Sequence, residues 1–305
     1  MVLTGVISAF FAAILQSSCY LVAGLYAKRS NLPGWTLTFP QQIAMLPLAI
    51  VLAAVFYPYA SAPQWCSLLP YLALCTIAGL SGNFGLFQMQ KYVEPSRTAP
   101  LQAFKIPLIV LFSFFFYSQS YSVQQLTGVF VIMVASKLVS GAGERMSTAA
   151  WGWLIFCSSG FALSDVAIGR MLQINSTVAG SVFQNAMFTL GIALVFSGVA
   201  AIPLFFVQAA RPSLVPRFSV LAKYAFGYSA LWIVALAALF YAFASSSVEL
   251  GTIVQSSRSL ISVVIGYVLA KYGFLKDVEY KVSPRVFLVR LFAALLIIFA
   301  IYLNS

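Results

Sequence analysis

Two basic side chains lie within apolar stretches that are long enough to be buried in a lipid bilayer. Lys105 falls in LQAFKIPLIVLFSFFF, residues 101–116, and Arg258 falls in VQSSRSLISVVIGYVL, residues 254–269. A cation near the bilayer centre costs about 2.5–3.5 kcal/mol on insertion scales, so such residues face a cavity or a partner and are functional candidates by default. We therefore expect both cations to face a shared polar cavity, where an anion could bridge them.

A glutamine precedes each cation by three residues, Gln102 before Lys105 and Gln255 before Arg258. Residues three apart on a helix share a face, so each amide is expected beside its cation. Amide donors and acceptors next to a cation suit a carboxylate, a phosphate or a sugar hydroxyl. This pattern favours an anionic or zwitterionic substrate over the lipophilic cations that small multidrug exporters bind with a buried acid.

Asp165, in SSGFALSDVAIGR, is the carboxylate placed well inside an apolar run. Its simplest role is a buried ion pair with one of the two cations, which would leave the site with a net positive charge. A carboxylate near a cation can also change its protonation with occupancy, so Asp165 is alternatively a coupling residue that takes up a proton.

Other polar residues in the apolar stretches could line the same cavity. The alternative for each is an ordinary hydrogen bond between neighbouring helices. These candidate substrate-binding residues are Gln16, Tyr20, Asn83 and Gln184.

The composition of the chain is that of a polytopic membrane protein. Its 305 residues are 62% hydrophobic and 8% charged, with no histidine and a mean hydropathy of +0.96. The net charge of +11 comes from basic residues scattered singly between apolar stretches. Because no basic cluster could follow a phosphate backbone, nucleic acid is not an expected partner.

No arrangement of residues indicates an enzyme. The chain lacks histidine, a GxSxG motif and a Walker lysine, and Cys19, Cys66, Cys75 and Cys157 show no CxxC spacing. We therefore expect no catalytic residue, no metal and no cofactor. Any transport would draw on a gradient, with H⁺ or a counter-substrate as the coupling partner.

The apolar windows of spanning length predict an all-α integral membrane protein with about ten transmembrane helices. The first window lacks a basic leader, so we expect a permanent helix and not a cleaved signal. The windows cover residues 4–26, 36–57, 67–89, 97–118, 123–140, 150–171, 179–207, 225–244, 249–271 and 286–303.

The chain also repeats itself weakly. Residues 42–52 match 184–194 at an offset of 142, and Gln102 and Lys105 match Gln255 and Arg258 at an offset of 153. Short apolar words can recur by chance, but these matches keep one order along the chain. They predict two five-helix repeats, 1–145 and 146–305. An odd number of helices in each repeat makes the second inverted relative to the first, as in many secondary transporters.

Two long stretches resemble the drug/metabolite transporter superfamily. They are KYVEPSRTAPLQAFKIPLIVLFSFFFYSQSYSVQQLTGVFVIMVASKLVSG, and GTIVQSSRSLISVVIGYVLAKYG followed by VSPRVFLVRLFAALLIIFAIYL. The resemblance implies ten helices and both termini in the cytoplasm. The chain departs from the EamA-like pattern in having Ser118-Gln119-Ser120 where an acidic residue is usual. LQAFKIP is closer to nucleotide-sugar transporters, which implies a phosphate-binding role for Lys105.

The sequence therefore predicts a secondary transporter that moves a small polar metabolite, anionic or zwitterionic, across a lipid bilayer by alternating access. The alternatives are an exporter of amino acids or neutral metabolites, as in the EamA-like branch, and a membrane scaffold or lipid-handling protein. The chain length favours a bacterial plasma membrane over a eukaryotic organelle. The sequence indicates no oligomeric state.

The distribution of basic residues and the family resemblance predict opposite orientations of the chain in the membrane. Of the 17 Lys and Arg residues, all but Lys105, Arg258 and Arg170 lie in or beside odd-numbered connections. The positive-inside rule then puts those connections in the cytoplasm and both termini outside. The resemblance implies the reverse, and we favour the prediction from charge.

Overall fold

The computed structural model describes residues 2–30, 32–93, 95–117, 120–141, 146–209, 218–272 and 284–304. Within these ranges all regular secondary structure is helical. Besides the 3₁₀ turn η1 (Gly34–Leu37), the helices are α1 (Val2–Arg29), α2 (Thr38–Val55), α3 (Trp65–Met89), α4 (Pro95–Gln102), α5 (Lys105–Tyr117), α6 (Val123–Gly141), α7 (Thr148–Asn175), α8 (Val182–Ala209), α9 (Phe218–Ser245), α10 (Val248–Gln255), α11 (Arg258–Lys271) and α12 (Pro284–Asn304).

Helices of spanning length account for most of the described chain, which is an all-α integral membrane protein. The other two predicted windows are also helical, as α6 and α12, and the apolar part of α6 is the shorter Val123–Ala135. Eight segments in the described ranges are long and apolar enough to cross a membrane: Leu3–Ala27, Gly34–Val55, Trp65–Met89, Arg97–Phe116, Thr148–Asn175, Val182–Ala209, Phe218–Ser245 and Leu250–Leu269.

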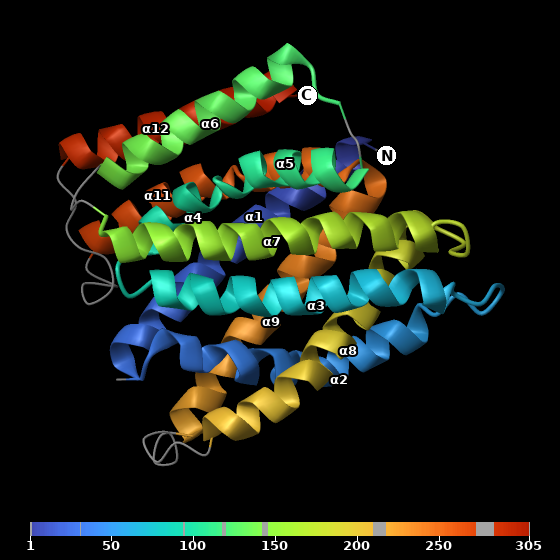
Figure 1. Ribbon diagram of the computed structural model, residues 1–305. Helices are drawn as coiled ribbons and strands as arrows, with labels where there is room; N and C mark the ends of the chain where they lie inside the picture. The colour runs from blue at the N-terminus through green and yellow to red at the C-terminus, as the bar shows by residue number, and fades with distance from the viewer. Residues whose placement is uncertain are drawn as a thin grey trace.

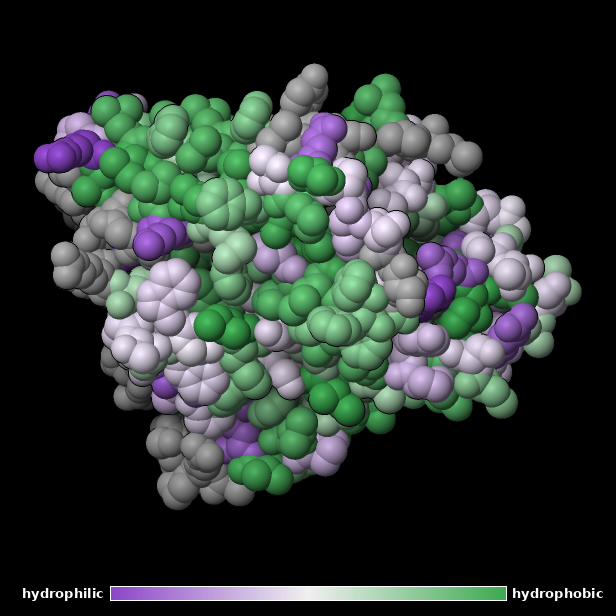
Figure 2. Space-filling model, turned by 45° about the horizontal axis from the view of Figure 1, so that its top comes forward, coloured by the Kyte–Doolittle hydropathy of each residue, from purple (hydrophilic) through white to green (hydrophobic). Residues whose placement is uncertain are grey.

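The surface of the bundle is apolar and its interior holds polar groups. Large apolar side chains such as Leu3, Phe115 and Phe206 are at least 66% exposed, and apolar residues cover the middle of the face shown in Figure 2. Exposure of such a surface to water would cost free energy, whereas lipid chains solvate it. By contrast, Gln16 and Lys105 are buried. This distribution is the one expected of a protein whose outer solvent is a bilayer.

The long helices pack in pairs from the two halves of the chain. In Figure 1, α6 and α12 lie together at one edge, and α2 lies beside α8 at the opposite edge. Between these edges α3 packs against α7, and α1 packs against α9. Each of these four main contacts therefore joins a helix of residues 1–145 to a helix of residues 146–305.

Glycines allow α3 and α7 to approach closely. A Cβ on Gly160 would lie 2.7 Å from the Ala78 oxygen and from the Gly82 nitrogen. A Cβ on Gly85 would lie 2.8 Å from the Cβ of Cys157. Small residues let membrane helices gain dispersion contacts at short range, which replace the hydrophobic driving force that lipid cannot supply.

Two of the predicted spans are interrupted, which the sequence analysis did not expect. The window 97–118 is divided into α4 and α5 by Ala103 and Phe104, and the window 249–271 is divided into α10 and α11 by Ser256 and Ser257. The two interruptions lie 153 residues apart, which is the offset that relates Lys105 to Arg258.

The two interruptions have different chemical causes. Pro107 has no N–H to donate to the carbonyl of Ala103 four residues earlier. That carbonyl accepts instead from Ile106 N, three residues ahead, at 3.0 Å, which tightens the chain at this point. At the second interruption, the Ser256 hydroxyl donates to the Thr252 carbonyl at 3.0 Å, and such local bonds compete with helical geometry. In both places the chain continues through a tight turn, with Phe104 N donating to Leu101 O at 3.0 Å and Ser257 N donating to Val254 O at 3.0 Å.

We predict that Gly160→Ala destabilises the protein, because its methyl group would collide with the backbone of α3. Overpacking of this kind costs about 1–3 kcal/mol, so the melting temperature in detergent should fall by several degrees. Gly152→Ala on the same helix is the matched control, since nothing lies within 4 Å of a Cβ there. The close-packing interpretation fails if both variants melt like the wild type.

Candidate functional site

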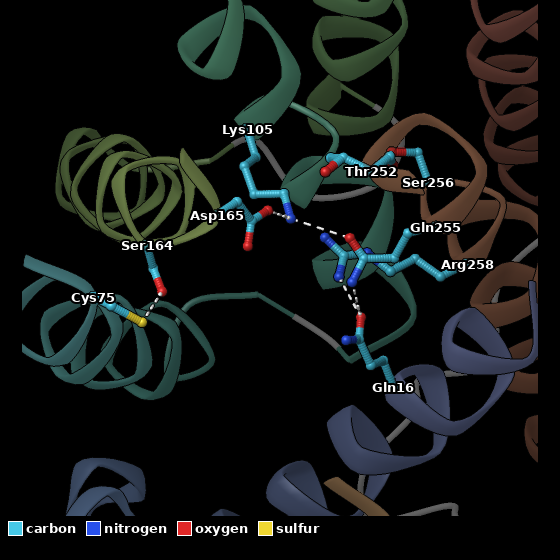
Figure 3. Close-up of polar contacts among 9 residues, drawn as sticks. All are labelled: Gln16, Cys75, Lys105, Ser164, Asp165, Thr252, Gln255, Ser256 and Arg258. Carbon is cyan, nitrogen blue, oxygen red and sulfur yellow. Dashed lines mark hydrogen bonds and ion pairs between the residues drawn. The ribbon is translucent and has the colours of Figure 1, made fainter. Parts of the chain in front are cut away.

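The two intramembrane cations lie directly after the two helix interruptions. Lys105 is the first residue of α5 and Arg258 is the first residue of α11. Both are only 4% exposed. Figure 3 shows the two side chains extending from their interruptions toward a common region between α1 and α7.

Lys105 makes two contacts in this region. Its Nζ donates to Asp165 Oδ2 on α7 at 2.6 Å and to Gln255 Oε1 at the end of α10 at 3.1 Å. The first contact is the ion pair considered in the sequence analysis. The second joins the cation of one half of the chain to the glutamine of the other half (Figure 3).

Arg258 is held by an amide and an aromatic ring on α1. Gln16 Oε1 accepts from Arg258 Nη1 at 2.8 Å and from Gln255 Nε2 at 2.6 Å. The guanidinium carbon lies 5.7 Å from the centroid of the Tyr20 ring, within the range of a cation–π interaction. We call Gln16, Lys105, Asp165, Gln255 and Arg258 the central network.

The central network has an excess positive charge. It contains two cations, and its one carboxylate, Asp165, contacts Lys105. Arg258 is met by the neutral amide of Gln16, and its buried Nε has no hydrogen-bond partner. Burial of a charge is costly unless it is paired and hydrogen-bonded. The network is therefore suited to accept an anion beside Arg258.

A cavity of about 80 Å³ lies against the central network. Seven of the residues singled out from the sequence line it: Gln16, Tyr20, Asn83, Lys105, Asp165, Gln255 and Arg258. Asn83 also donates to the Gly79 carbonyl at 3.0 Å, and its buried Oδ1 has no hydrogen-bond partner. The cavity thus brings together residues from α1, α3, α5, α7, α10 and α11.

The structure does not bring Gln102 and Gln184 into this cavity. Gln102 is fully buried and donates to Cys157 Sγ on α7 at 2.6 Å. Gln184 lies near the start of α8, where its side chain accepts from Gly180 N at 2.8 Å and donates to Tyr57 O at 3.3 Å. These contacts make Gln102 a helix-packing residue and Gln184 part of a helix end.

Other lining residues were missed in the sequence analysis. Gln42 lines the cavity, and its buried Oε1 has no hydrogen-bond partner. Its match with Gln184 at an offset of 142 was a signal that could have drawn attention to it. The apolar lining residues had no distinguishing signal in so apolar a chain: Ile168, Ala193, Leu194, Trp232, Leu236, Leu239 and Phe240.

A larger hollow of about 570 Å³, which we call the vestibule, adjoins the cavity residues along two helices. Asp165 and Phe240 line the cavity, whereas Val166 and Phe243, slightly farther along α7 and α9, line the vestibule. The vestibule reaches the C-terminal ends of these helices, and Arg170 is among its lining residues.

Aromatic side chains close the cavity on the side away from the vestibule. Trp232 lines the cavity, and its ring is stacked on Tyr228 with centroids 5.5 Å apart. Tyr228 in turn contacts Phe87 of α3 edge-on at 5.8 Å. All three side chains are buried. The cavity therefore has an open hollow toward one end of the bundle and an aromatic stack toward the other.

Comparisons with known proteins identify the fold but no family. No family model matches the chain, and no curated protein is significantly similar to it. Chains of solved structures do match, among them one described as "Crystal structure of protein", with 16% sequence identity and a TM-score of 0.60 over 99% of this chain and 96% of that chain. At this level of identity the likeness concerns the fold alone, which extends over nearly the full length of both chains.

We predict that Lys105 and Asp165 are energetically coupled. Removal of one partner of a buried ion pair costs about 3–5 kcal/mol, because the other charge is left uncompensated, whereas removal of both can be nearly neutral. Lys105→Met and Asp165→Asn should each lower the melting temperature in detergent, and the double variant should melt above the more damaged single variant. Lys223→Met, at an exposed position on α9, is the control. Strictly additive losses would contradict the coupling.

Proposed function

We propose that this protein is a ten-helix secondary transporter of the drug/metabolite type that moves a small anionic or zwitterionic metabolite by alternating access. One observation carries the proposal: a buried cavity holds Lys105 and Arg258, one from each half of the chain, with a single carboxylate in their network. Intramembrane cations around a cavity are typical of substrate pathways. No chemical step is needed for this activity, so we propose no enzymatic role.

The arrangement of helices supports two repeats, 1–145 and 146–305. In two such repeats α1 would correspond to α7, and α3 would correspond to α9. The contact of α3 with α7 would then correspond to the contact of α9 with α1, and both contacts occur. Likewise α2 would correspond to α8, and α6 to α12, so each of these two pairs consists of equivalent helices in contact. Gly191 of α8 approaches Ala53 of α2, while Gly198 approaches Leu46, so α2 and α8 run antiparallel. Equivalent helices that run antiparallel are what inverted repeats require.

The central network suggests how substrate and coupling partner would interact. An anion entering from the vestibule would compensate Arg258 and compete with Asp165 for Lys105. Asp165, once separated from Lys105, would accept H⁺ or the ammonium group of a zwitterion. Rocking of the two repeats would then separate the Phe87–Tyr228–Trp232 stack and close the vestibule. A counter-substrate of the same charge could occupy the site on the return step.

An exporter of amino acids or neutral metabolites is the second candidate. The Lys105–Asp165 contact at 2.6 Å favours it, because a cation that is already paired leaves the substrate to be bound by Arg258, amides and aromatic rings. A scaffold is disfavoured by the polar cavity, since a scaffold would fill its midplane with apolar side chains. For either transporter we propose a bacterial plasma membrane as the location.

We predict that Lys105→Gln and Arg258→Gln each reduce transport below one-tenth of the wild-type rate, because each variant removes a charge that binds the substrate anion. A thermal-shift screen with inorganic phosphate, carboxylates, organic phosphates and amino acids would first identify a stabilising compound, and its uptake would then be measured in proteoliposomes. Lys223→Gln, exposed on α9, should transport normally. Full activity of both cavity variants in folded protein would refute the site.

We also predict that both termini lie outside the cell, from the bias of basic residues toward odd-numbered connections. Some of the residues on which this prediction depends lie outside the described ranges: Arg145, Arg211, Arg217, Lys276 and Lys281.

The cysteines provide a test of this orientation without engineered tags. Cys66, the second residue of α3, is exposed, whereas Cys19, Cys75 and Cys157 are buried. Cys66 follows the α2–α3 connection, which lies at the same end of the bundle as the N-terminus. A membrane-impermeant maleimide should therefore label intact cells expressing the protein, and Cys66→Ser should abolish the signal. Labelling that requires lysed cells would show that the termini are cytoplasmic.

A further inference from the structure

The cavity beside the central network has two walls of different chemistry. Helices α1, α5, α7, α10 and α11 contribute charged and amide groups, including Lys105 and Arg258, and α2 and α3 add the amides of Gln42 and Asn83. Helices α8 and α9 contribute a second set that is almost wholly apolar, with Leu194, Trp232 and Leu236 among its members. The division follows the helices, so it is a property of the architecture and not of one side chain.

The apolar wall offers an occupant few hydrogen bonds. Among its lining residues Ser197 supplies a hydroxyl and Trp232 an indole N–H, and the others present hydrocarbon or aromatic surface. A sugar or polyol hydroxyl facing this wall would lose its water without a replacement partner, which weakens binding. A methylene group in the same position would instead leave water, with a gain of about four-fold in affinity for each group that is fully buried.

The size of the cavity limits the occupant as well. At about 80 Å³ it is well below the roughly 300–1,000 Å³ of pockets that hold drug-sized ligands. A nucleotide or a nucleotide sugar therefore exceeds this space, whereas a compound with one anionic group and a body of a few carbon atoms matches it.

The geometry points to a small amphipathic organic anion as the substrate: a carboxylate with a short aliphatic or aromatic body. Its charge lies between Lys105 and Arg258, and its body lies against Trp232 and Leu236. This inference rests on the proposed transport function and names the substrate class of the same site. Trp232 is then a residue that determines specificity, because its ring is part of the apolar wall and does not contact the charged group.

Binding of a homologous series to the purified full-length protein tests the inference. The probes are acetate, propanoate, butanoate and phenylacetate, compared with inorganic phosphate, malate and the uncharged butanamide, by isothermal titration in detergent. Affinity should rise about two- to four-fold per methylene from acetate to butanoate. Phosphate and malate should bind at least ten-fold more weakly than butanoate, and butanamide should not bind measurably.

Variants distinguish the contribution of the charged groups to binding from that of the apolar wall. Trp232→Ala should leave acetate binding within two-fold of the wild type and reduce the gain per methylene by at least half. Leu236→Ser should do the same with less change in packing, so the test survives if the tryptophan variant does not fold. Trp65→Ala, at a tryptophan outside the cavity lining, is the matched control. Lys105→Gln should weaken every acid at least ten-fold without removing the chain-length trend.

The outcomes distinguish the inference from the function on which it rests. Lys105-dependent binding that is independent of chain length, or stronger for phosphate and malate, would overturn the amphipathic substrate while leaving an anion transporter. A chain-length trend unchanged in both Trp232→Ala and Leu236→Ser would also overturn it. Failure of every anion to bind in a Lys105-dependent way would instead refute the proposed function itself.

Discussion

The need to stabilise two positive charges in a medium without water determines much of this structure. Lipid offers no dipoles to a lysine or an arginine, so the protein must supply them from its own side chains. It does so with one carboxylate for Lys105 and with the oxygen of Gln16 for Arg258. Gln255 joins the two, donating to Gln16 and accepting from Lys105. The contacts cross from one half of the chain to the other, so the charges can be stabilised only when both halves are assembled.

The absence of water in the bilayer also limits where the helices can be interrupted. A continuous helix satisfies all of its backbone groups, and a break inside a bilayer is tolerated only where protein or a polar cavity surrounds it. Each break contains one buried residue, Ala103 in the first and Ser256 in the second, and each is directly followed by a cation of the central network. One arises from a proline and the other from serines, so the same geometry has been reached with different residues. The close glycine contacts of α3 and α7 help to form the tightly packed surroundings that the breaks require.

The sequence predicted the location of the helices well because an apolar window of about twenty residues has few alternatives in a bilayer. It also selected seven of the cavity residues, because a polar side chain in such a window must contact other polar groups or a polar cavity. It missed the interruptions, although Pro107 marked one of them, because it cannot donate to the Ala103 carbonyl four residues earlier and that carbonyl accepts from Ile106 N instead. It misplaced Gln102 and Gln184 because residue type alone does not say whether an amide meets a cavity or a neighbouring helix. The apolar wall could not be predicted, since Trp232 and Leu236 differ from lipid-facing residues only in where the fold directs them.

The stacked Tyr228 and Trp232 rings of α9 have no aromatic equivalents at the matching positions of α3. The offset of 153 that relates α3 to α9 places Tyr228 and Trp232 opposite Cys75 and Gly79, so two rings on one side correspond to a thiol and a hydrogen atom on the other. If the proposed alternating access exchanges the roles of the two halves, this inequality would make the two facing states differ in energy. The protein would then rest mainly in the state that keeps the rings packed. Under the proposed function, such an imbalance would leave the final distribution of substrate across the membrane unchanged, but it would give a different half-saturation concentration on each face.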